Sequence, residues 1–448
     1  MKKIFLLSVL CCLSISVKAQ FVHEPLNFPG VGYFTFYLDA VDSNSVWVGV
    51  NYISGSGAYL PYSNAVRTID GGSNWQFYPL PDTGLVVIFD VAATDINTAY
   101  YVIYNGRTAI WKTMNGGSSW INMATTVFIG GFANFYHAFS AGTGIAGGDP
   151  NNGYWELQRT YDGGNSWSRV PSSNIPVPLT NEYGLAHGFC AIGNSIWFVT
   201  TKGRCYRSVN QGLNWTVKQL PGTWVQPHVC FIDSLRGVAW DPNPYLKTQP
   251  TYNNYFLTTD GGLSWTQQSL AQNYAIQNFS RIPGVNGGML ISVIDSNNEN
   301  LTTVLYTPDF LNTLAIIQTK IISSGQCNFL DNKTGWLAGD GFHNSSIYKF
   351  TGNLPVCVSE TLEGKPQLQV CPNPSFAEAI LKVPAAFNGT NGIIRILDIT
   401  GKETYQKVIT KSSSYNQLDA AKFINGIYII QLITDDGASA VCRWVVCH

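Results

Sequence analysis

The chain has 448 residues, which is long enough for more than one domain. Its net charge is −1, from 26 basic and 27 acidic side chains, and no basic stripe runs along it, which argues against nucleic acid as a partner. Charged residues make up only 12% of the chain, while glycine and aromatic residues are abundant, and this composition is typical of a turn-rich all-β protein.

The N-terminus has the pattern of a secretory signal peptide. Met1-Lys2-Lys3 is followed by the apolar run 4–17, and Val17-Lys18-Ala19 supplies a cleavage signal before Gln20. We therefore expect residues 1–19 to be removed and the chain to be exported. No later apolar run is long enough to span a bilayer, so no transmembrane segment is expected.

Eight cysteines remain after the signal peptide, and export permits disulfides among them, although the sequence leaves their pairing open. The chain has no Cys-x-x-Cys pair and no His-x-His, so we expect no structural metal site and no cofactor.

An eight-residue stretch, Thr68–Trp75, recurs along the first two thirds of the chain. The template is Ser/Thr-x-Asp/Asn-x-Gly-x-x-Trp, and the further copies are Thr113–Trp120, Thr160–Trp167, Ser208–Trp215 and Thr258–Trp265. The Asp or Asn can accept bonds from backbone N–H groups, glycine allows positive φ, and Trp packs over the turn. Each copy therefore predicts a stabilised β-hairpin turn with a structural role for Asp70, Trp75, Asn115, Trp120, Asp162, Trp167, Asn210, Trp215, Asp260 and Trp265.

This stretch resembles the Asp-box of BNR repeats. Successive boxes lie 45, 47, 48 and 50 residues apart, a spacing that predicts a β-propeller with four-stranded blades. A weaker copy at Thr307-Pro308-Asp309 and a partial unit over 335–350 bring the count to seven blades, with a six-bladed ring, as in sialidases, as the alternative. Phe21–Leu26 resembles the strand after the first box, so we expect it to pair with Ile347–Phe350 and close the ring over residues 20–352.

Residues 353–369 are interpreted as a linker, and 370–448 as a second unit of short strands. The combination of Pro372-Asn373-Pro374, Asp398-x-x-Gly401-Lys402 and Asn425-Gly426-Ile427-Tyr428 resembles the type A C-terminal sorting domain of the Bacteroidetes type IX secretion system. The resemblance implies a small β-sandwich that the translocon and sorting machinery recognise, and delivery of the chain to the cell surface or to the medium. The family usually has Tyr at the position of Cys371; with Cys442 and Cys447, this departure suggests a local disulfide.

Candidate ligand-binding residues are expected on the propeller face opposite the boxes, where loops carry function on a rigid scaffold. One set follows the second strand of a blade: Asp149, Asp241 and Asp340, with Asn51 and Asp295. The other set is placed at the entrance to the innermost strand: Asp90, His137, His187, His228, Arg281 and Gln326. Together they are predicted to ring the mouth of the central channel.

Two kinds of function fit this prediction. Asp149 and Asp241 are the candidate acid/base pair of a glycoside hydrolase. Ser280-Arg281-Ile282-Pro283 resembles the sialidase Arg-Ile-Pro motif, but it follows five boxes instead of preceding the first, and no arginine triad is visible. The blades also resemble non-enzymatic propellers related to the photosystem II assembly factor, which bind a protein partner. We therefore expect an exported propeller that binds an extracellular glycan or protein, with hydrolysis of an extracellular polysaccharide as the alternative.

Overall fold

The computed structural model describes most of the chain after the expected signal peptide. The described residues are 20–28, 32–53, 59–60, 64–81, 86–242, 253–271, 274–295, 301–312, 314–321, 326–338, 346–354, 368–371, 373, 375, 378–398, 401–411 and 415–446. The predicted signal peptide, most of the predicted linker, Asp340 and Cys447 lie outside these ranges. Among the described residues no helix is long and apolar enough to cross a membrane; the helices are three short 3-10 turns, Ser172–Asn174, Ala385–Phe387 and Ala420–Lys422.

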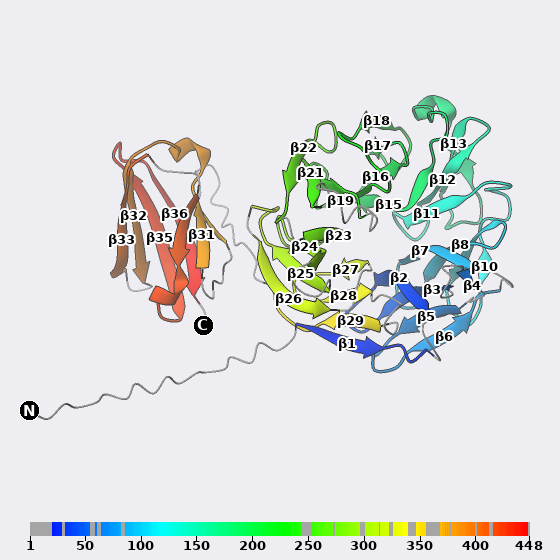
Figure 1. Ribbon diagram of the computed structural model, residues 1–448, viewed down its shortest axis with the longest axis horizontal. Helices are drawn as coiled ribbons and strands as arrows, with labels where there is room; N and C mark the ends of the chain where they lie inside the picture. Colours follow the sequence, from blue (N-terminus) through cyan, green and yellow to red (C-terminus); the bar gives the residue numbers. More distant parts are fainter. Residues whose placement is uncertain are drawn as a thin grey trace, which may run out of the picture.

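The described residues before 355 form seven antiparallel sheets arranged in a ring (Figure 1). The first three sheets are β2 (Tyr33–Ala40), β3 (Val46–Ile53), β4 (Tyr59–Leu60), β5 (Asn64–Thr68) and β6 (Gln76–Pro79); β7 (Val87–Ala93), β8 (Ala99–Tyr104), β9 (Thr108–Thr113) and β10 (Ile121–Asn122); and β11 (Ala133–Ala138), β12 (Gly144–Asn151), β13 (Tyr154–Thr160) and β14 (Ser168–Arg169). The next three are β15 (Gly184–Ile192), β16 (Ser195–Thr200), β17 (Arg204–Ser208) and β18 (Thr216–Gln219); β19 (His228–Phe231), β20 (Gly237–Trp240), β21 (Asn254–Thr258) and β22 (Thr266–Ser269); and β23 (Tyr274–Arg281), β24 (Met289–Asp295), β25 (Thr302–Thr307) and β26 (Ala315–Ile321). The chain is a β-propeller in this region, as the box spacing predicts.

The last sheet joins the two ends of the ring. It contains β27 (Cys327–Phe329), β28 (Gly335–Ala338), β29 (Ser346–Phe350) and, as its outermost strand, β1 (Phe21–Pro25). β1 pairs antiparallel with β29, with Phe21 opposite Phe350, which confirms the predicted closure. The innermost strand of each sheet contacts that of the next, and β27 contacts β2, so the contacts run around the whole circle.

Each box closes the turn between the third and fourth strands of its sheet. In the first box, Thr68 Oγ1 donates to Asp70 Oδ1 at 2.8 Å, Gly72 N donates to Thr68 Oγ1 at 3.0 Å, and Asn74 N donates to Asp70 Oδ1 at 2.9 Å. The same three bonds form in the other four boxes. The degenerate copy keeps the bond from Thr307 to Asp309, at 3.0 Å, although Phe310 and Leu311 have positive φ where four of the five boxes have two glycines.

The residues from 368 onward form two further sheets around a core of their own. β30 (Gln369–Cys371), β31 (Glu378–Lys382) and β34 (Tyr415–Asp419) form one, and β33 (Glu403–Ile409), β32 (Gly392–Asp398), β35 (Gly426–Thr434) and β36 (Ser439–Val446) form the other. Asn373, from the Pro-Asn-Pro motif, is bonded to β36: its side chain donates to the Arg443 carbonyl and accepts from Val445 N, both at 2.7 Å.

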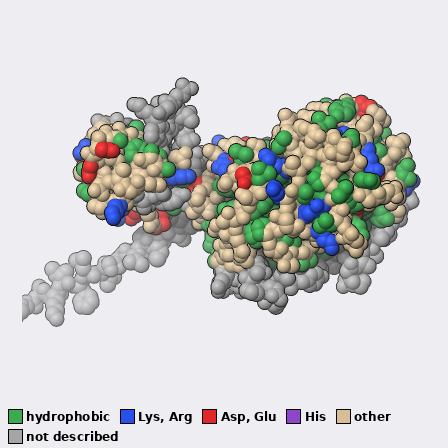
Figure 2. Space-filling model, turned by 90° about the horizontal axis from the view of Figure 1, so that it is seen from above, with side chains coloured by type: hydrophobic (Ala, Val, Ile, Leu, Met, Phe, Trp, Pro, Cys, Tyr) green, Lys and Arg blue, Asp and Glu red, His purple; other side chains and the backbone are tan. Residues whose placement is uncertain are grey.

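Figure 2 shows one face of the molecule, with apolar side chains scattered among polar ones.

Candidate functional site

Asp90, predicted to face a ligand, instead joins two neighbouring sheets. It is buried on the innermost strand β7, where Oδ2 accepts from Tyr136 N of β11 at 3.0 Å and Oδ1 accepts from Val91 N at 3.0 Å. Burial, with the charge of Asp39 adding to the effect, raises the pKa of Asp90 to about 7. The backbone therefore occupies both oxygens of this carboxylate.

Asp39, which sequence reasoning missed, has the same role on β2. Its carboxylate accepts from Ala93 N in the next sheet at 2.7 Å and from Asn328 Nδ2 in the preceding sheet at 3.0 Å. Burial raises its pKa to about 7 as well. The available signal was a single acid within the otherwise apolar run Phe36-Tyr37-Leu38-Asp39-Ala40.

Such a hydrogen bond joins every pair of neighbouring sheets within the described part of the ring. The others are Asn51 with both backbone groups of Ile88, Asp149 with Gly184 N, Cys190 with Phe231 N, Trp240 with the Gln277 carbonyl, Ser280 with the Cys327 carbonyl, and Gln326 with Leu38 N. Because a buried polar group without a partner is costly, these side chains satisfy backbone groups that the sheets leave open. Several predicted site residues therefore hold the ring together.

The predicted set at the strand entrances does not lie at one level. His228 is the first residue of β19, but His137 is the penultimate residue of β11 and Arg281 is the last residue of β23. The links into the innermost strands differ in length, 170–183 before β15 against 270–273 before β23, so counting from the boxes gives the wrong register. The side chain of His187 lies outside the described part of the structure.

Of the three predicted histidines, His137 and His228 have side chains that the structure describes, and both are half-buried and neutral. Burial lowers the pKa of His137 to about 4, with the charge of Arg281 adding to the effect, and burial lowers that of His228 to about 4. Within the described ranges, no group of three His, Cys, Asp or Glu side chains could hold a metal ion.

Asp149 and Asp241, the candidate acid/base pair, both organise links on the face opposite the boxes. Asp149 Oδ1 accepts from Asn134 Nδ2 and from Gly184 N, both at 2.9 Å, and burial raises its pKa. Asp241 Oδ2 accepts from Val225 N at 2.6 Å and from Gln226 N at 3.1 Å. The cavity lined by Asn134 and Gly184 measures about 10 Å³, which is room for one water and not for a sugar ring.

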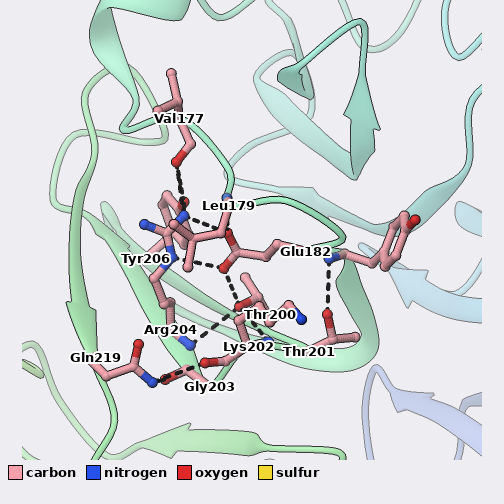
Figure 3. Close-up of polar contacts among 11 residues, drawn as sticks. Val177, Leu179, Glu182, Thr200, Thr201, Lys202, Gly203, Arg204, Tyr206 and Gln219 are labelled. Carbon is pink, nitrogen blue, oxygen red and sulfur yellow. Dashed lines mark hydrogen bonds and ion pairs between the residues drawn. The ribbon is translucent and has the colours of Figure 1, made fainter.

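On the same face, the link 170–183 is held from beneath by a buried ion pair (Figure 3). Glu182 is 1% exposed and receives Arg204 Nε at 2.9 Å, Thr200 Oγ1 at 2.5 Å and Leu179 N at 2.7 Å. Arg204 also donates to the Val177 carbonyl at 2.9 Å. Burial alone would raise the pKa of Glu182, but these hydrogen bonds hold it below its usual range. The conformation of the link is therefore fixed around Glu182.

This network positions apolar side chains that point to solvent. Val177, Leu179 and Tyr183 are 58%, 50% and 48% exposed. The next link, 220–227, continues the surface through Trp224. Trp224 packs closely on Gly203, the residue before Arg204: a Cβ added to Gly203 would lie 2.6 Å from the Trp224 ring. Val225, beside it, is 47% exposed. We call Val177, Leu179, Tyr183, Trp224 and Val225 the link surface.

Comparison with known proteins confirms the C-terminal sorting domain and supports the β-propeller fold. Residues 369–446 match the secretion system C-terminal sorting domain, which marks the chain for export by the type IX secretion system to the cell surface or the medium. A solved structure described as YCF48 bound to D1 peptide is similar, with 14% identity, a TM-score of 0.54, and coverage of 75% of this chain and 97% of that one. YCF48 from Cyanidioschyzon merolae has 12% identity, a TM-score of 0.55, and coverage of 74% and 98%. No curated protein matches the chain.

Proposed function

We propose that this exported propeller binds an extracellular protein, and that the link surface is where it binds. The observation that carries the proposal is the buried Glu182–Arg204 pair beneath exposed Val177 and Leu179. Burying an ion pair is an inefficient way to gain stability, so its presence under a surface link is best explained by a need for one fixed conformation. A fixed surface loses less conformational entropy on binding than a mobile loop does.

The chemistry of the link surface favours a protein over a glycan. Three of its five side chains, Val177, Leu179 and Val225, are aliphatic and exposed, whereas sugar recognition needs aromatic faces with convergent polar groups. Exposed apolar side chains that lie close together typically mark protein interaction sites. The fold relative whose structure contains a D1 peptide provides a precedent for a propeller of this kind holding a polypeptide.

Hydrolysis has less support. Asp149 and Asp241 each accept two hydrogen bonds from neighbouring groups, and the cavity beside Asp149 is too small for a sugar. Both carboxylates hold neighbouring backbone segments in place, which favours binding over hydrolysis.

The test is a selection of phage-displayed random peptides on the full mature chain, in parallel with a binding panel of soluble polysaccharides. Peptides selected by the wild type should bind the Leu179→Ser, Tyr183→Ser variant at least about tenfold more weakly, as expected for the loss of two apolar contacts. The matched control is Ile69→Ser, Met114→Ser, two similarly exposed apolar residues on the box face, which should leave binding unchanged. Retention of a polysaccharide without any peptide enrichment, or release of reducing sugar that Asp241→Asn abolishes, would contradict the proposal.

A further inference from the structure

Two cysteines of the ring lie against each other on neighbouring innermost strands. Cys190 is on β15 and Cys230 on β19, strands that contact each other. Across its sheet, the residue after Cys190 aligns with Ser208, the first residue of its box, and the residue after Cys230 aligns with Thr258, the first residue of the next box. The two cysteines therefore lie at the same level of the ring. Phe231 N donates to Cys190 Sγ at 3.3 Å, which places the Cys190 sulfur beside the peptide bond that follows Cys230. The two thiols are close enough to shift each other's pKa.

The two thiols differ in access and in charge. Cys190 is partly exposed, whereas Cys230 is 8% exposed. The hydrogen bond with Cys230 lowers the pKa of the Cys190 thiol, and the Phe231 N–H and the charge of Arg281 act in the same direction against burial. The hydrogen bond to Cys190 and burial raise the pKa of Cys230. A partly exposed thiol of lowered pKa beside a second thiol of raised pKa is the arrangement that favours thiol–disulfide exchange.

The neighbouring cysteines do not share this environment. Cys205, on β17, and Cys327, on β27, are buried, and burial raises the pKa of Cys205 to about 12. Cys371 is disulfide-bonded, so the mature chain already contains an oxidised cysteine. The sorting domain marks the chain for export to the cell surface or the medium. Disulfides persist in these oxidising compartments.

We infer that Cys190 and Cys230 form a redox-active pair that is oxidised to a disulfide joining the sheets of β15 and β19. The oxidant is a protein disulfide encountered during export. The Cys190 thiolate attacks one sulfur of that disulfide, forming a mixed disulfide and releasing the other sulfur as a thiolate. Cys230 then loses its proton and its sulfur attacks the Cys190 sulfur, which forms the Cys190–Cys230 bond and releases the oxidant's remaining sulfur as a thiolate. The chain has then given up two electrons and two protons, and the oxidant has become a dithiol. The new bond would hold together the two sheets whose links carry the link surface, but the inference is independent of what that surface binds.

The experiment uses the full mature chain, reduced with dithiothreitol, freed of it, and incubated with oxidised glutathione. The protein is then unfolded, alkylated with iodoacetamide and digested without reduction for mass spectrometry. The expected product is a peptide pair linked through Cys190 and Cys230, lighter by two hydrogen atoms than the two reduced peptides. In the folded reduced chain, iodoacetamide should modify Cys190 at least about tenfold faster than Cys205.

Variants separate this pair from its surroundings. Cys230→Ser should accumulate a glutathione adduct on Cys190, because the resolving thiol is gone, whereas Cys205→Ser should still yield the 190–230 linkage. Recovery of both Cys190 and Cys230 as alkylated thiols after oxidation of the wild type, or linkage of Cys190 to Cys205, would overturn the inference. The wild-type peptide map decides the question even if a variant fails to fold.

Discussion

The buried carboxylates Asp39 and Asp90 make the stability of the ring depend on pH. Their folded pKa values are raised from 3.8 to about 7, so the native state keeps protons that the unfolded state has released. The stabilisation from this protonation is fully present below pH 4 and is lost as the pH rises through 7. A shift of this size corresponds to at most about 4 kcal/mol for one group.

Asp90→Asn isolates the effect of one carboxylate. The amide cannot ionise, but its oxygen can still accept from Tyr136 N. Relative to wild type, the variant should therefore become more stable as the pH rises from 5 to 8, by at most about 3 kcal/mol, because only about two pH units separate pH 5 from the folded pKa. The difference from wild type is the informative quantity, because His137 and His228, with pKa values lowered from 6.5 to about 4, favour folding in the opposite sense over part of this range.

The assay is urea unfolding of the full mature chain at pH 5, 6, 7 and 8, followed by tryptophan fluorescence. Asp42→Asn, an exposed carboxylate that accepts bonds from Asn44 N and Ser45 N, is the matched control and should show a flat difference. If the stability difference between Asp90→Asn and wild type is the same at pH 5 and pH 8, or favours wild type more at pH 8, then the assignment of Asp90 as a buried, protonated group is wrong.

Three further predictions concern closure, the link and export. Phe21→Ala should destabilise the propeller by about 3–5 kcal/mol in chemical unfolding, because Phe21 is 2% exposed and packs on Phe329 and Phe350. The control Val22→Ala, at a 43% exposed position of the same strand, should cost little. Equal effects of the two substitutions would contradict ring closure by β1. Glu182→Ala should cost about 3–5 kcal/mol and expose 170–183 to limited proteolysis, since Arg204 would be left partly buried without its partner; an unchanged cleavage pattern would argue against a fixed link. Removal of residues 369–446 should leave the propeller in the periplasm, as cell fractionation would show, and its appearance at the surface would contradict sorting by this segment.

The fold was predictable where the sequence repeats itself. Thr68, Asp70 and Gly72 recur with the same local bonds, so their hairpin can be inferred without any distant contact. The closing strand was predictable for a related reason: Phe21–Leu26 resembles the strand after the first box, and an incomplete last unit requires such a strand.

The candidate site was harder to predict, because its residues depend on contacts that no repeat encodes. Asp39 accepts from Asn328, which is 289 residues away, and only the assembled ring brings the two together. Glu182 lies in a link that has no counterpart of the same length in the other sheets, so its pairing with Arg204 leaves no periodic signal. His137 and Arg281 were misplaced because link lengths vary, which breaks the alignment counted from the boxes.

The placement of β1 also constrains the order in which the molecule can be made. Phe21 is among the first mature residues synthesised, but its partner Phe350 is among the last of the propeller. A nascent chain therefore leaves β1 without its partner strand β29, and the ring open, until more than three hundred further residues have been synthesised. Contacts of such high sequence separation form slowly, so closure of the ring is a late step in the folding of this propeller.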